Sequence, residues 1–88
     1  MKIKDGYLLR NIADAWIIVP IGARIYDFNG IMTVNETGSF LWGKLKEGLS
    51  KQELVVSLIN EYDVDTVTAD NDVEMFLQSL IEGDVLEV

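Results

Sequence analysis

Apolar residues recur with two different periods along this 88-residue chain, and the change of period limits the folds it can adopt. Before Asn35, runs of β-branched and aromatic residues alternate with turn signals, a pattern typical of short strands. After Asn35, apolar residues recur at offsets of three and four, as on one face of a helix. Strands followed by helices predict an α+β domain, with three helices packed on a three-stranded antiparallel sheet.

The strands are predicted from apolar runs and from the residues that interrupt them. Turns are expected at Asp14-Ala15 and at Asn29-Gly30. Pro20 lacks an amide proton and ends the second run. This run is apolar throughout and is therefore expected to be buried on both faces or nearly so. A short extended segment, residues 25–28, leads into the last turn. The predicted strands are Tyr7–Ile12, Trp16–Val19 and Ile31–Val34.

Three helices are predicted after the strands. Asn35 suits the N-cap of the first helix, which is expected to end at Gly48. Ser50 and Glu53 match a capping box at the start of the second. The third helix is expected over Thr68–Glu82, with apolar positions at offsets 0, 3, 4, 7 and 8: Val73, Phe76, Leu77, Leu80 and Ile81. Residues 1–88 are expected to form a single domain.

Charge is distributed unevenly along the chain. It contains 7 basic and 15 acidic residues, a formal net charge of −8 at pH 7, and every basic residue lies at or before Lys51. The acidic remainder repels polyanions, so no nucleic-acid partner is expected. No apolar stretch reaches the roughly 20 residues of a membrane-spanning helix, and no signal peptide is recognisable. We therefore expect a soluble, cytoplasmic protein without a membrane partner.

Catalytic and metal-binding side chains are scarce. The chain has no histidine and no cysteine, which removes the usual general base, the usual zinc ligand and any thiol nucleophile. Ser50 precedes Lys51, but its hydroxyl is expected to cap a helix. The carboxylates of Asp70, Asp72 and Glu74 are expected in a solvated first helical turn. We therefore predict a binding protein rather than an enzyme, with no cofactor and no metal site.

The strand Ile31–Val34 is expected to form an edge of the sheet. It contains no Lys, Glu or Pro, the residues that usually protect an edge against pairing. An unprotected edge can accept an added strand, and we expect the amide of Met32 to be one of the donors. Two alternatives remain open. A terminal strand at Val85–Val88 could cover the edge through Val85-Leu86, or a second copy of the chain could do so.

A second exposed apolar position is expected on the third helix. Met75 projects about 200° around the helix from Val73, outside the apolar stripe. Asp72 and Ser79 lie in line with it. Methionine adapts its shape to different partners and is frequent at peptide-binding surfaces. The sequence therefore offers two candidate surfaces, a strand edge and a helix face.

The order of several motifs over nearly the whole chain resembles the PqqD family. The most specific part runs from Val34 to Trp42 and contains Asn35-Glu36-Thr37-Gly38. Further matching segments lie on both sides of it: Tyr7-Leu8-Leu9-Arg10, Trp16-Ile17-Ile18-Val19-Pro20-Ile21-Gly22, Tyr62-Asp63-Val64-Asp65 and Leu80-Ile81-Glu82-Gly83-Asp84-Val85-Leu86.

This resemblance implies a winged-helix-like fold and the role of a peptide chaperone. Such proteins bind the leader segment of a ribosomally synthesised precursor peptide and present it to a modifying enzyme, often a radical SAM protein. In the family, the leader adds to the third strand and packs against the third helix. Carried over by position, the peptide-binding site comprises Ile31, Met32, Thr33, Val34, Asp72, Met75, Phe76 and Ser79. The acidic Glu82-Gly83-Asp84, where a basic residue is common, implies a different leader or enzyme partner.

Two other functions remain open at this point. A winged-helix domain can place a recognition helix in the major groove of DNA. The helix expected in that role, Thr68–Glu82, contains four acidic residues and no Lys or Arg, so phosphate contacts would be lacking. The chain could also be a structural dimerisation domain, a homodimer paired edge to edge at Ile31–Val34.

Overall fold

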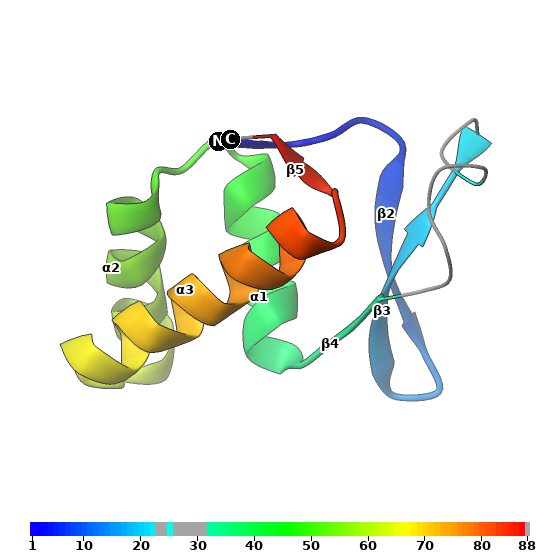
Figure 1. Cartoon of the computed structure of the whole chain (residues 1–88). Coiled ribbons are helices and arrows are strands. Elements are labelled where there is room, and N and C mark those ends of the chain that lie inside the picture. The colour runs from blue at the N-terminus through cyan, green and yellow to red at the C-terminus, as the bar shows by residue number, and fades with distance from the viewer. Residues whose placement is uncertain (23–24, 26–31, 88) are drawn as a thin grey trace.

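The computed structural model describes residues 1–22, 25 and 32–87. Its elements follow one another as β1 (Lys2–Ile3), β2 (Tyr7–Ile12), β3 (Ala15–Pro20), β4 (Met32–Val34), α1 (Glu36–Lys46), α2 (Lys51–Tyr62), α3 (Thr66–Glu82) and β5 (Leu86–Glu87). The three helices lie on one side of the β2–β3 hairpin (Figure 1). The α+β fold with a three-stranded antiparallel sheet and three helices is therefore confirmed.

Part of the connection between β3 and β4 lies outside the described residues. This part includes the predicted turn at Asn29-Gly30, the predicted strand residue Ile31 and most of the segment 25–28. Ile25 is described, and it lies in a 3₁₀ turn instead of the expected extended segment. The positive φ of Gly22, 60°, turns the chain soon after β3 ends.

Strands β2, β3 and β4 form an antiparallel sheet in that order, as predicted. The turn between β2 and β3 consists of Ala13 and Asp14, whose φ angles are 51° and 65°. Ala15 already pairs with Ile12, so the expected turn at Asp14-Ala15 is wrong by one residue. Positive φ at both central residues is what a type I′ two-residue turn requires, but an alanine there gives no sequence signal.

Strand β3 is buried on one face only. Ile18 is fully buried, whereas Ile17 and Val19, which point to the opposite face, are half-buried. The burial is therefore complete only toward the helices, which cover a single face of the sheet (Figure 1), and partial on the opposite face. Pro20 ends the strand as expected.

A second, two-stranded sheet joins β1 to β5. Ile3 lies opposite Leu86, and the amide of Lys4 donates to the carbonyl oxygen of Val85 at 2.8 Å. The predicted terminal strand thus forms over Leu86–Glu87, but it pairs with β1 and not with β4. The C-terminal segment therefore leaves the β4 edge of the three-stranded sheet uncovered, which removes one of the two alternatives for that edge.

The first two helices begin at the predicted caps. The side-chain oxygen of Asn35 accepts a 2.8 Å hydrogen bond from the amide of Gly38. Ser50 and Glu53 form both hydrogen bonds of the capping box. Both caps are short-range sequence signals, which explains why these starts were predictable.

The third helix begins two residues before its expected start. Asp65 caps it by accepting a 2.7 Å hydrogen bond from the amide of Thr68. Asp70, Asp72 and Glu74 consequently lie beyond the first turn, in which they were expected. Their carboxylates therefore lie too far along α3 to gain much from the dipole at its N-terminus.

The core lies between the sheet and the helices. Its largest fully buried side chains come from both: Ile18, Leu41, Leu54, Leu58, Val73, Leu80 and Val85. Ile81, expected in the core, is 38% exposed because it lies about 80° around α3 from Val73, at the margin of the apolar stripe. No helix in the described part of the chain is long and apolar enough to cross a membrane.

Candidate functional site

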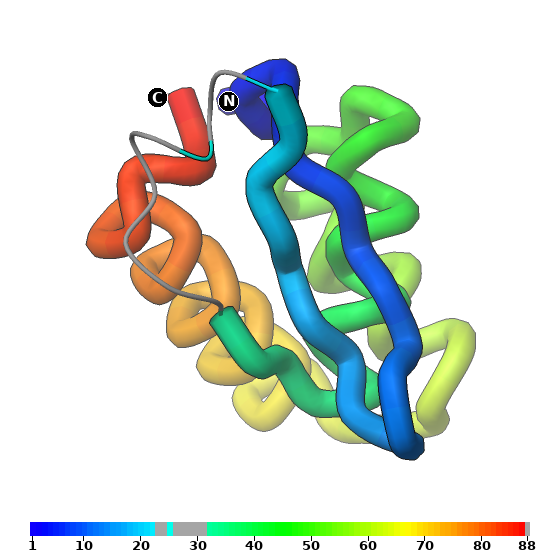
Figure 2. Tube along the Cα trace, turned by 90° about the vertical axis from the view of Figure 1, so that its right-hand side faces the viewer, coloured from blue at the N-terminus to red at the C-terminus, as the bar shows by residue number. Residues whose placement is uncertain are grey.

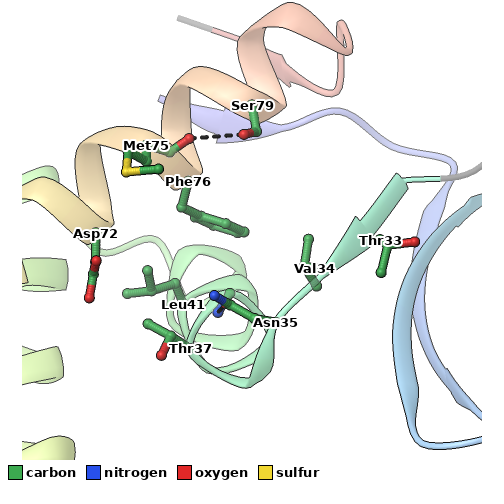
Figure 3. Close-up of a pocket in the computed structure, with 10 residues that line it drawn as sticks. Thr33, Val34, Asn35, Thr37, Leu41, Asp72, Met75, Phe76 and Ser79 are labelled. Carbon is green, nitrogen blue, oxygen red and sulfur yellow. Dashed lines mark hydrogen bonds between the residues drawn. The ribbon is translucent and has the colours of Figure 1, made fainter.

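A groove of about 200 Å³ lies between strand β4 and helix α3 (Figure 3). The N-terminal half of α1 contributes to its floor together with Val34 and Phe76, because α1 starts directly after β4 and passes beneath α3. The residues that line it are Thr33, Val34, Asn35, Thr37, Gly38, Leu41, Asp72, Met75, Phe76 and Ser79.

Six of the eight residues expected to bind peptide line this groove: Thr33, Val34, Asp72, Met75, Phe76 and Ser79. Met32 belongs to β4 but does not line the groove. Ile31 lies outside the described residues. The sequence did not single out Asn35, Thr37, Gly38 or Leu41 as site residues, because α1 contributes to the groove only once it is folded beneath α3.

Gly38 allows the three elements of the groove to approach one another. A Cβ atom at this position would lie 3.0 Å from Cβ of Val34 and 3.4 Å from Cδ1 of Phe76. Phe76 is buried, and its ring points from α3 toward Val34 on β4 (Figure 3). The floor is therefore apolar and shaped by close packing.

The rim of the groove on α3 is more exposed and mixed in character. Met75 is 70% exposed, and the hydroxyl of Ser79 donates to its carbonyl oxygen at 3.0 Å. Asp72 is half-buried, and no Lys or Arg among the described residues forms an ion pair with it. On the neighbouring side of the helix, Glu74 pairs with Lys51 of α2. Asp72 thus leaves a carboxylate at the groove that lacks a cationic partner within the described structure.

The register of the sheet determines which backbone groups of β4 face outward. At the turn, the last residue pair of the β2–β3 hairpin is Ile12 with Ala15. At the other end of the hairpin, the amide of Ile21 donates to the carbonyl oxygen of Gly6 at 2.8 Å. Between these two points, every second residue pair of the hairpin is hydrogen-bonded. Trp16 and Ile18 belong to the pairs that are not, so their backbone groups point away from β2 and toward β4.

Strand β4 consequently offers the amide and carbonyl of Thr33 at its outer edge, which no other described strand covers. Trp16 lies opposite Val34 and Ile18 opposite Met32, so the backbone groups of these two β4 residues are directed to β3. The expectation that Met32 provides an edge donor is therefore wrong. The side chain of Met32 instead packs beside Gly83 at the end of α3, where any Cβ atom would collide with its Cε.

Two helix-capping carboxyl groups have shifted pKa values. Hydrogen bonding from Thr68 lowers the pKa of Asp65, and hydrogen bonding from Ser50 lowers the pKa of Glu53. Neither side chain lines the groove. In the described part of the chain, no three carboxylate side chains gather where they could hold a metal ion. The groove therefore offers a binding surface of mixed apolar and polar side chains with one carboxylate.

Comparison with known proteins gives a consistent result. The family model described as coenzyme PQQ synthesis protein D (PqqD) matches residues 16–86. One similar solved structure is TbiB1 in complex with the TbiA(beta) leader peptide, with 29% sequence identity and a TM-score of 0.77. The match covers 99% of the present chain and 95% of the TbiB1 chain. A lasso peptide synthetase B1 complexed with the leader peptide shares the fold, at 17% identity, 92% and 89% coverage and a TM-score of 0.73. No curated protein matches the chain.

Proposed function

Because the chain belongs to the family of coenzyme PQQ synthesis protein D, we propose that it binds the leader segment of a ribosomally synthesised precursor peptide and presents that peptide to a modifying enzyme. TbiB1, which is 29% identical to the chain, is complexed with a leader peptide, and this supports the same class of ligand here. The observation that carries the proposal is the open edge of β4 beside the groove.

The leader adds to the sheet as a fourth strand. Main-chain hydrogen bonds to Thr33 hold it, each contributing on the order of 1 kcal/mol net. Successive residues of a strand point to opposite faces, so the leader residues on either side of the one opposite Thr33 point toward α3. Selectivity then comes from two side chains, spaced two residues apart, that enter the groove.

The lining of the groove defines the side chains it accepts. Val34, Leu41 and Phe76 favour an apolar residue at the floor, and exposed Met75 can adjust to its shape. Asp72 favours a neutral or cationic leader residue and disfavours an acidic one.

The chemistry itself belongs to the partner enzyme, for which a radical SAM protein is our leading candidate. The chain has no histidine and no cysteine, and the groove residues include no activated nucleophile, which supports a non-catalytic role. Helix α3 contains no Lys or Arg, so a DNA-recognition role is disfavoured. A cytoplasmic location fits a ligand made by the ribosome.

The test is a titration with leader segments of candidate precursor peptides from the genome that encodes this chain. Fluorescence anisotropy of the labelled leader should report saturable binding, and a scrambled leader should not bind. In hydrogen-exchange NMR, the Thr33 amide should gain protection on binding, whereas the amide of Asn11, which points outward from the opposite edge strand β2, should not. Saturable binding with protection at Asn11 in place of Thr33 would refute the proposed site.

A further inference from the structure

The face of the sheet that points away from the helices is apolar and lacks cover from any described helix. Tyr7 and Ile18 are buried under the helices, so the residues that alternate with them along β2 and β3 point to the opposite face. These residues form three pairs across the hairpin: Leu8 with Val19, Arg10 with Ile17 and Ile12 with Ala15. In Figure 2 the hairpin lies in front of the helices, so this outer sheet face is directed to solvent.

Arg10 is the single charge among these six residues. Its side chain is exposed and forms no ion pair with a described residue. Ile12 beside it is 53% exposed, and Ile17 and Val19 are half-buried. A surface that buries the Arg10 guanidinium leaves an unpaired charge unless it supplies a carboxylate, so a partner with a carboxylate at this point suits the face best.

We infer that the outer sheet face docks the modifying enzyme, through an apolar patch on that enzyme that contains one carboxylate. This inference rests on the proposed function. The leader would occupy the β4 edge and the groove on the helix side of the sheet, so both partners can bind at once. A second copy is the less suitable occupant, because these six residues offer no carboxylate and two chains of net charge −8 repel each other.

The experiment combines direct contact with reconstituted modification. The probe is the purified enzyme that modifies the precursor whose leader this chain binds. The cross-linker p-benzoylphenylalanine is placed at Ile12 or, as a control, at Val67, which is 71% exposed near the start of α3. Cross-linking to the enzyme should occur from position 12 and not from position 67, with or without the leader. Cross-linking from position 67 alone would overturn the inference.

Variants that place a negative charge on the outer sheet face then measure its effect on the rate at which the enzyme modifies the precursor peptide. Arg10→Glu and Ile12→Asp should keep leader affinity within about twofold and lower the modification rate at least tenfold, while the matched variant Lys46→Glu on α1 should change neither. Unchanged rates in Arg10→Glu and Ile12→Asp, or a dimer of the wild-type chain that Ile12→Asp dissociates, would overturn the inference. Failure of the wild-type chain to bind the leader would refute the proposed function instead, whatever the cross-linking shows.

Discussion

The three-stranded sheet has two edges that differ in what lies beside them. Strand β2 is six residues long and directs the backbone of Asn11 to its open side, whereas β4 is three residues long and directs only that of Thr33. Helix α3 faces β4 across the groove, so an added strand there gains side-chain contacts as well as main-chain hydrogen bonds. The contrast teaches that a neighbouring helix, more than strand length, makes an edge selective.

The largest expected effect is on stability and comes from Phe76, whose ring packs against the β4 side of the groove. Phe76→Ala should lower the free energy of unfolding by about 3–5 kcal/mol, because it removes a buried ring from the core. Phe76→Leu should cost less than about 1.5 kcal/mol. Asn11→Ala, on the exposed β2 edge, should change stability little. Denaturant unfolding measures all three, and a loss below about 1 kcal/mol for Phe76→Ala would show that the groove floor is not part of the core.

Proline substitutions compare the two edges directly. Thr33→Pro removes the outward amide of β4 without removing a hydrogen bond to β3, so leader affinity should fall about tenfold or more in a folded protein. Asn11→Pro is the matched change on β2 and should leave leader affinity unchanged. Calorimetric titration decides between them. Equal losses in both variants, or a loss in Asn11→Pro alone, would contradict the assignment of the leader to β4.

A smaller effect is expected from the carboxylate at the rim. Asp72→Asn should weaken a leader that carries a cation at the groove by up to about fivefold, since exposed pairs contribute at most about 1 kcal/mol. The affinity of the wild-type chain for that leader should fall as salt is added. Asp70→Asn is the control, because Asp70 is exposed and does not line the groove. An affinity that rises with salt would argue against a cationic contact at Asp72.

The smallest effect is a pH dependence that lies outside the groove. The pKa of Asp65 is lowered in the folded chain by its hydrogen bond from Thr68. The stabilisation is therefore present above the ordinary pKa of 3.8 and is lost as pH falls through the lower folded value. Asp65→Asn should flatten the dependence of the melting temperature on pH below about 4, and leader affinity at pH 7 should not change. A steeper dependence in the variant would contradict the cap.

The sequence predicted local features well. Asn35 and Ser50 cap their helices with partners three residues away, so the signal and the structure lie in the same short segment. The candidate residues of β4 and α3 were also identifiable, because each lies on a strand or helix face with a clear period. Gly38 and Leu41 were not, because they reach the groove only through the packing of α1 under α3.

The position of the hairpin turn determines which residue of β4 faces outward. With the hairpin turn placed at Asp14-Ala15, the alternation along β3 shifts by one residue and would direct Met32, not Thr33, to the open edge. The observed turn at Ala13 and Asp14 reverses that assignment. Which residue of β4 receives the leader is thus set by a turn on the opposite side of the sheet, where the sequence gives no strong signal.

The pairing of β1 with β5 also determines when the fold can be completed. Ile3 cannot reach its partner until Leu86 has been synthesised, so nearly the whole chain must be available before this contact forms. Contacts between such distant residues require costly loop closure and slow folding. Val85 is fully buried beside Gly83, so the end of α3 packs when β5 pairs with β1. A nascent chain therefore completes this second sheet only after translation has passed the last helix.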